Sequence, residues 1–260
     1  MIKKLTFLSL SIGLMFYMSS CEELEDALNT DLTEAEIVEG LKEALVVGTD
    51  TSTSILGATN GYLKDEAVKI LLPEEAQPIL DNMDELGITS VIQPFIDQTI
   101  ESINRAAEES AALDSTKTIF KDAITTMTIT DGFTILTGSD SAATVYLKGR
   151  TYSRLLTNFS GIISPVLEKD LINGVNLSTE ELYTKLINTY NDGVTVYNTI
   201  NILNPNKHMD KITSNSLAEH ATSRALDGLF LKVSEEEKAI REDPIARVTA
   251  ILQKVFGSQD

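Results

Sequence analysis

A small set of polar residues lies beside apolar positions of the expected helices, and it is the first place to look for a binding site. The set comprises Asn104, Arg105, Glu108, Asp131, Arg150, Arg154, Arg224, Asp227 and Arg241. Because a guanidinium group binds planar anions through two parallel hydrogen bonds, convergence of these residues on one pocket would suit an anionic or amide-bearing ligand. Such a pocket requires Arg105, Asp131, Arg150 and Asp227 to lie close together.

The same polar set has a purely structural interpretation. Arg105 and Glu108 are three residues apart, as are Arg224 and Asp227, and this spacing lets opposite charges pair along one helix face. Ion pairs of this kind, within or between helices, would fix the packing register of the helices and bind nothing. Both interpretations stay open at this point.

Motifs for metal, cofactor or nucleophilic chemistry are missing from the sequence. His208 and His220 form no His-x-x-x-His pair, and the single cysteine forms no Cys pair, whereas a zinc site needs three or four ligands. The sequence also lacks an Asp-x-Asp-x-Asp-Gly loop, a Gly-x-Ser-x-Gly elbow and both glycine-rich phosphate loops. We therefore expect no metal site and no cofactor, and an enzyme is the less favoured class.

The N-terminus has the order of a secretory signal. Lys3 and Lys4 precede an uncharged run over residues 5–18, which is shorter than the roughly 20 apolar residues that span a bilayer. The end of the run, Met18-Ser19-Ser20-Cys21, resembles the lipobox of bacterial lipoproteins, in which the cysteine sulfur carries the lipid. We predict a signal peptide over residues 1–20 and lipidation of Cys21. The alternative is a buried, inert thiol behind a plain signal peptide or an anchor helix.

Charge limits the partners of the chain. The formal net charge is −18, and it becomes −20 once Lys3 and Lys4 are removed with the signal peptide. Such a chain is repelled by nucleic-acid phosphates, so we expect no nucleic-acid partner and expect membrane attachment through the lipid on Cys21.

Residues 21–32 read as an acidic flexible tether. Four acidic residues follow Cys21 closely and resemble the surface-export signal of some lipoproteins, while Glu22 at the position after the cysteine argues against retention at an inner membrane. The expected location is the cell envelope, with the outer membrane favoured and the periplasmic or surface face left open.

Helix signals recur from Thr33 to Gly257. Capping-box spacing is present in the pairs Thr33 with Glu36, Ser178 with Glu181 and Ser234 with Glu237. Apolar periodicity predicts helices over residues 74–86, 90–113 and 120–127, and Pro244 opens a last helix that places Ile245, Val248, Leu252 and Val255 on one side. Thr and Ile alternate too briefly over residues 127–136 for a strand, so we expect a turn and a short helix there.

These elements predict an all-α fold, a single, mainly antiparallel, bundle-like domain over residues 33–260. Gly, Asn, Ser and Thr are frequent in residues 48–61, 173–176 and 201–210, which we expect to be loops. No internal repeat or domain linker is evident. The core should centre on Phe95, Ile103, Phe120, Met127, Leu229, Phe230, Leu252 and Phe256.

Several phrases of the sequence resemble one family. They are Ile103 to Glu108, Met127 to Gly132 with Ile135-Leu136, Ala142 to Tyr146, and Ala225 to Phe230 with Ile240-Arg241 and Pro244. In this order they resemble domain-of-unknown-function family 4197, roughly from Leu41 to Phe256. The resemblance implies a bacterial secreted or lipid-anchored helical protein, and it implies no activity.

Two classes of function follow from the sequence. The favoured class is a non-enzymatic envelope lipoprotein whose helical body binds a small molecule or a partner protein. The alternative is an envelope hydrolase or lyase that uses acidic residues such as Glu108, Asp131 or Asp227. A concave pocket that holds a carboxylate with a strongly raised pKa next to a nucleophile or water site would favour the enzyme, whereas a flat exposed apolar groove would favour a binding partner.

Overall fold

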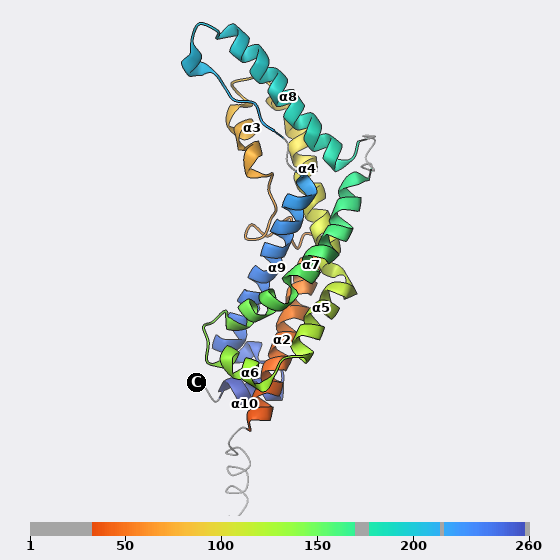
Figure 1. Cartoon of the computed structure of the whole chain (residues 1–260), viewed down its shortest axis with the longest axis vertical. Coiled ribbons are helices and arrows are strands. Elements are labelled where there is room, and N and C mark those ends of the chain that lie inside the picture. Colours follow the sequence, from red (N-terminus) through yellow and green to blue (C-terminus); the bar gives the residue numbers. More distant parts are fainter. Residues whose placement is uncertain (1–32, 170–176, 214–215, 258–260) are drawn as a thin grey trace, which may run out of the picture.

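The structure is a computed structural model that describes residues 33–169, 177–213 and 216–257. Its helices pack side by side along one long axis (Figure 1). The predicted signal peptide, Cys21, the tether and the predicted loop at residues 173–176 lie outside the described residues.

The described residues form helices and no β-strand, which confirms the all-α prediction. The α-helices are α2 (Glu34–Gly57), α3 (Gln77–Asn82), α4 (Thr89–Ala112), α5 (Asp114–Thr125), α6 (Ile129–Leu136), α7 (Ala142–Glu168), α8 (Thr179–Ile200), α9 (Leu217–Glu242) and α10 (Ala250–Gly257). Short 3-10 turns occupy Glu74–Ala76, Pro205–Lys207 and Pro244–Ala246. Within the described residues, no helix is long and apolar enough to cross a membrane.

The centre of the molecule is a bundle of α2, α4, α7 and α9, with α5 packed against α2 and α7. Helix α8 packs mainly on α4 and continues the long axis away from the start of α2, while α6 and α10 lie beside the first half of α2 (Figure 1). The first turn of α2 and the free end of α8 therefore stand at opposite ends of the molecule.

The core agrees closely with the sequence prediction. Seven of the eight predicted core residues are buried, and Phe95 is partly buried, with its ring covered by the ammonium group of Lys185 at 5.0 Å. Apolar side chains recur every three or four residues on the inner faces of the long helices, and burial of these faces is the main stabilising term. Met127 and the helix after it belong to the same core, so the segment that alternates Thr and Ile is helical as expected.

Two of the three predicted capping boxes are present. The backbone N–H of Thr33 donates to the Glu36 carboxylate at 2.9 Å, and the N–H of Ser178 donates to Glu181 at 2.7 Å. The third prediction was wrong, because Ser234 and Glu237 both lie inside α9, which begins after the N-cap residue Ser216.

The predicted loop over residues 48–61 was wrong for residues 48–57, where α2 continues to Gly57. The hydroxyl groups of Thr49, Ser52 and Thr53 donate to carbonyl oxygens one turn earlier, at 2.7–2.8 Å. These side chains are buried, and because their own hydroxyls are satisfied by the helix, they pack in the core like small apolar residues. Residues 201–210 are non-helical except for the short 3-10 turn, as predicted.

The C-terminal helix is shorter than predicted. Pro244 opens a 3-10 turn, and α10 starts only at Ala250. Ile245 and Val248 are exposed by 86% and 66%, so their prediction as members of the apolar side was wrong, whereas Leu252 is buried as expected. The helix predicted for residues 74–86 is also shorter, because α3 ends at Asn82.

Three asparagines hold non-helical segments against helices. Each side-chain amide donates to the carbonyl oxygen of one residue and accepts from the N–H of that same residue, at distances of 2.8–2.9 Å. The pairs, which we call the asparagine clamps, are Asn104 with Ile70, Asn191 with Ile212 and Asn198 with Met209. They satisfy backbone groups that have no helix or sheet partner.

Candidate functional site

The most extensive polar site in the described part of the chain surrounds Glu237, in the second half of α9. Its side chain reaches the N-terminus of α7, where the N-cap residue Ser141 makes no side-chain hydrogen bond. The backbone N–H groups of Ala143 and Thr144 donate to the two carboxylate oxygens at 3.0 and 2.8 Å, and the Thr144 hydroxyl donates at 2.8 Å. Because the first N–H groups of a helix lack partners within it and its N-terminus carries partial positive charge, Glu237 caps α7 from another helix.

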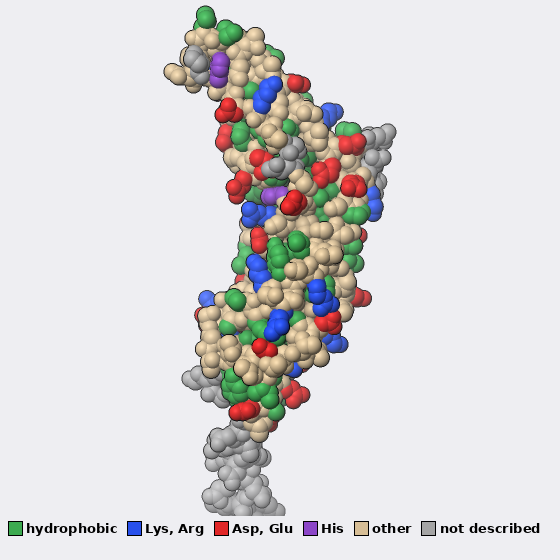
Figure 2. All heavy atoms as spheres, in the orientation of Figure 1, with side chains coloured by type: hydrophobic (Ala, Val, Ile, Leu, Met, Phe, Trp, Pro, Cys, Tyr) green, Lys and Arg blue, Asp and Glu red, His purple; other side chains and the backbone are tan. Residues whose placement is uncertain are grey.

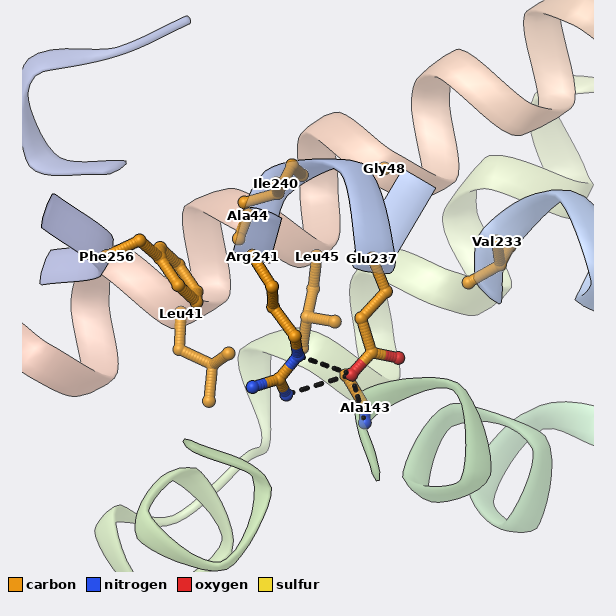
Figure 3. A pocket seen from close by; sticks show the side chains of 10 residues that line it. All are labelled: Leu41, Ala44, Leu45, Gly48, Ala143, Val233, Glu237, Ile240, Arg241 and Phe256. Atoms are coloured by element: carbon orange, nitrogen blue, oxygen red, sulfur yellow. Dashed lines mark hydrogen bonds and ion pairs between the residues drawn. The ribbon is translucent and has the colours of Figure 1, made fainter. Parts of the chain in front are cut away.

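Arg241 completes this site from the next turn of α9. Its Nε and one terminal nitrogen donate to the Glu237 carboxylate at 3.1 and 2.9 Å (Figure 3). The same terminal nitrogen also donates to the Ile135 carbonyl oxygen at 3.0 Å. The Glu237 and Arg241 side chains are only 7% and 11% exposed. Such a buried pair persists because each charge has its partners, and removal of either would leave the other charge unpaired.

An apolar pocket adjoins the pair. It lies between α2, α9 and α10, and Figure 3 shows the two charged groups beside its apolar side chains. The lining residues are Leu41, Ala44, Leu45, Gly48, Ala143, Val233, Glu237, Ile240, Arg241 and Phe256. Inside this pocket, the space that the centre of a water molecule can occupy is about 20 Å³. This is enough for about one water and too small for an organic ligand.

The chemistry open to Glu237 is limited by its hydrogen bonds. Five donated bonds reach its two oxygens, from the two backbone N–H groups, the Thr144 hydroxyl and two nitrogens of Arg241. A carboxylate has about four lone-pair sites, so no acceptor capacity is left for a substrate proton. The arrangement is suited to holding α6, α7 and α9 together.

A second buried carboxylate, Glu108 of α4, holds the turn that follows α2. The N–H groups of Tyr62 and Leu63 both donate to one of its oxygens at 3.3 Å, and Arg105 donates to the other at 2.8 Å. Arg105 also donates to the Asn60 side chain at 3.0 Å, and Asn60 has a φ of 69°, a left-handed conformation that asparagine tolerates well. The hydrogen bond from Arg105 to Glu108, and the charge of that carboxylate, raise the pKa of Arg105.

The same part of α4 holds the rest of this segment. Asn104 clamps Ile70, and the fully buried Tyr62 donates its hydroxyl to the Ala225 carbonyl oxygen on α9 at 2.8 Å. Burial of the phenol, and to a lesser degree the negative charge of Glu108, raises the pKa of Tyr62 well above its usual value. Asn104, Arg105 and Glu108 thus fix residues 60–70 against α4.

The other predicted site residues have local partners. Asp131 forms a capping box with Thr128 at the start of α6, and the backbone hydrogen bond, followed by the hydroxyl, lowers the pKa of Asp131. The Arg150 guanidinium lies 5.4 Å from the centre of the Tyr146 ring, in cation–π geometry.

A group of exposed ion pairs involves residues of α5, α7 and α9. Arg224 and Lys148 approach the Asp227 carboxylate at 3.6 and 3.8 Å, and Arg154 donates to Asp122 at 2.7 Å. Exposed pairs of this kind contribute about 0–1 kcal/mol each, so these residues do little for stability.

The predicted residues therefore fall into separate clusters. Arg105 pairs with Glu108, Asp131 with Thr128, and Asp227 with Arg224 and Lys148, and Arg241 is the member of the set that lines the pocket beside Glu237. The described contacts agree with packing roles, and a ligand-binding role for the set stays a prediction. The described residues also contain no group of three His, Cys, Asp or Glu side chains placed to hold a metal ion.

Sequence reasoning missed Glu237 as the centre of a site. Its position three residues after Ser234 resembled a capping box, and nothing local indicates partners at Ala143 and Thr144, which lie more than 90 residues earlier. Ser141 gives no signal either, because serine is a favoured N-cap residue and only the structure shows that its side chain does not cap α7.

An exposed apolar cluster lies at the free end of α8. Val196, Ile200, Ile202 and Leu203 are 61%, 76%, 69% and 96% exposed. We call this end, residues 196–208, the distal tip, because it lies opposite the first turn of α2 (Figure 1). Clusters of exposed large apolar side chains are typical of interaction surfaces.

Comparison with known proteins gives one match. The model of a family described as a protein of unknown function, DUF4197, matches residues 31–257, which is most of the chain. No curated protein and no solved structure matches.

Proposed function

This chain belongs to the DUF4197 family, and we propose that it is a lipid-anchored envelope lipoprotein whose helical body binds a partner and does not catalyse a reaction. One observation carries the proposal. The described chain starts, after the predicted anchor and tether, at one end of the elongated body, and the exposed apolar cluster lies at the other end (Figure 1).

Helix lengths support a role as a spacer. Helix α2 has 24 residues and α8 has 22, and at about 1.5 Å per residue they measure about 36 and 33 Å. The two helices follow one another along the long axis, with α8 inclined to it, so the body is longer than either helix alone (Figure 1). The 12 residues of the tether, 21–32, add at most about 40 Å when fully extended.

The buried charges support binding rather than catalysis. Glu108 and Glu237 are both occupied by backbone N–H groups and by an arginine, so their hydrogen-bonding capacity serves the fold. The pocket beside Glu237 and Arg241 has room for about one water. An interaction surface on the outside of the body is therefore the better candidate.

The anchor is tested by metabolic labelling with a palmitate analogue. A processed lipoprotein cysteine carries three acyl chains, and at about 0.8 kcal/mol per buried CH₂ they hold the protein on the membrane permanently on a cellular timescale. The wild-type chain should take up label and have its mature N-terminus at Cys21. Cys21→Ser should take up none and remain an uncleaved precursor. A wild-type chain without label, or with another N-terminus, would show a plain secreted protein instead.

A further inference from the structure

The distal tip has three properties that together point to one kind of partner: its side chains are apolar, its shape is convex and its backbone is held in place. Leu203 is almost fully exposed, and Val196, Ile200 and Ile202 are each more than 60% exposed. Figure 2 shows hydrophobic side chains at this extreme end of the molecule, with a histidine just below them.

The chain that returns from the tip is bound to α8 at two points. Two asparagine clamps bind the returning chain to α8, Asn198 at Met209 and Asn191 at Ile212, with both hydrogen bonds of each clamp at 2.9 Å. Residues 201–208 are thereby held at the end of α8. Because both ends of this loop are fixed, ordering it against a partner costs less conformational entropy than ordering a free segment.

Charge selects among partners. The chain as a whole carries −18, yet residues 200–211 contain Lys207 and Lys211 against the acid Asp210, with His208 beside them. Glu85, which accepts a hydrogen bond from the Tyr197 hydroxyl, is a second acid at the base of the tip. Lys207 and His208 are exposed, as is Lys211. Apolar side chains flanked by lysines are the composition of segments that lie in the interface of a bilayer, where lysines contact anionic headgroups.

Size argues for a lipid surface over a protein. A stable protein interface buries about 800 Å² on each partner, usually across a broad face. The distal tip is one helix end and a short loop, whereas a bilayer needs only that apolar side chains enter the headgroup region by about 5–10 Å. We propose that the distal tip inserts into a phospholipid surface that contains anionic headgroups. This inference rests on the proposed function, because it names the partner of the lipid-anchored body.

A fluorophore at the tip tests the proposal on the full acylated chain. Cys21, the one natural cysteine, is blocked by lipid in the mature protein, so Asn204→Cys gives a single reactive thiol at an exposed tip position. The protein is labelled with nitrobenzoxadiazole and reconstituted at low density in vesicles of phosphatidylethanolamine and phosphatidylglycerol, and further protein-free vesicles are added. The matched control carries the label at Val145→Cys, which is 67% exposed on α7 and remote from the tip.

The expected result is a blue-shifted emission and protection from an aqueous quencher at position 204, and neither at position 145. The readout is the same whether the tip enters the vesicle that holds the anchor or a neighbouring one. Adding Ile202→Asp and Leu203→Asp should lower the inserted fraction by about tenfold or more. Adding Lys207→Gln and Lys211→Gln should lower it by about fivefold for each lysine.

Two results would overturn the proposal. The first is equal spectra at positions 204 and 145 in vesicles that hold the protein. The second is a blue shift that grows with the density of protein and is unchanged when phosphatidylglycerol is omitted, which would indicate contact between two copies of the chain. Flotation of the vesicles separates this test from the proposed function, because a failed anchor leaves the protein unbound, whereas a failed tip leaves it bound with an unshifted spectrum.

Discussion

Replacement of Glu237 by alanine is expected to be the most damaging single change at a charged residue. The substitution removes the acceptor for the N–H groups of Ala143 and Thr144 and leaves Arg241 with only the Ile135 carbonyl oxygen as its described partner. These donors lie where the N-terminus of α7 meets the second half of α9.

The magnitude follows from burial. A buried donor without a partner costs about 1–3 kcal/mol, and removing one member of a buried ion pair costs about 3–5 kcal/mol. The two costs are not additive, because Arg241 and the N–H groups share the Glu237 carboxylate as their acceptor. We therefore expect the free energy of unfolding to fall by about 3–5 kcal/mol, a large part of the roughly 5–15 kcal/mol that stabilises a typical domain.

Urea unfolding followed by circular dichroism measures this change. The control is Glu242→Ala, which breaks the Lys238–Glu242 pair on the same helix with the same spacing of four residues, but with both side chains about 60% exposed. The control should lose about 0.5 kcal/mol or less. Replacing Glu237 and Arg241 together with methionine should cost less than Glu237→Ala, because no charge is left unpaired. A loss below about 1 kcal/mol for Glu237→Ala would refute the reasoning.

Two further stability predictions use residues on α2. Gly57→Ala should lower the free energy of unfolding in urea by about 1–3 kcal/mol, because the new Cβ would lie 2.7 Å from the Ala112 Cα. The control Gly149→Ala, whose Cβ would have nothing within 4 Å, should raise it by about 0.5–1 kcal/mol. Equal effects of the two substitutions would contradict the close packing of α2 on α4. The backbone and hydroxyl hydrogen bonds of Thr33, followed by Lys254, lower the pKa of Glu36 from 4.5 to about 2, so its stabilising contribution is present above pH 4.5 and is lost as the pH falls toward 2. Glu36→Gln should therefore show a smaller loss of stability between pH 5 and pH 2 than the wild type, and curves of equal slope would contradict this.

Local sequence signals predicted much of the fold. The capping boxes at Thr33 and Ser178 were correct because each involves residues of a single helical turn, whose geometry is fixed once the helix starts. The same pattern gave a wrong prediction at Ser234 and Glu237. Both residues lie in the interior of α9, where the backbone N–H groups already have helix partners and no N-cap is required. The hydroxyl-rich part of α2 failed for a related reason, because burial against neighbouring helices outweighed the low helix propensity of Thr and Ser.

The candidate site could be predicted only in part. Asn104, Arg105 and Glu108 were correctly selected as polar residues beside core positions, but their partners, including Ile70 and Tyr62, lie in a segment without any motif. Long-range partners of this kind depend on how the helices pack, which spacing within one helix cannot specify. The lipidation of Cys21 lies outside the described residues and stays a prediction.

In the asparagine clamps, side chains of the helices hold the main chain of irregular segments. Each clamp makes hydrogen bonds only to the main-chain N–H and carbonyl oxygen of Ile70, Met209 or Ile212, and every residue except proline has both groups. Substitutions in the held segments should therefore be tolerated wherever the side chain faces solvent. The asparagines themselves are far less replaceable, because aspartate has no N–H to donate and glutamine is one carbon too long. The side chains of the irregular segments can therefore change while the three helix asparagines keep the backbone of these segments in place.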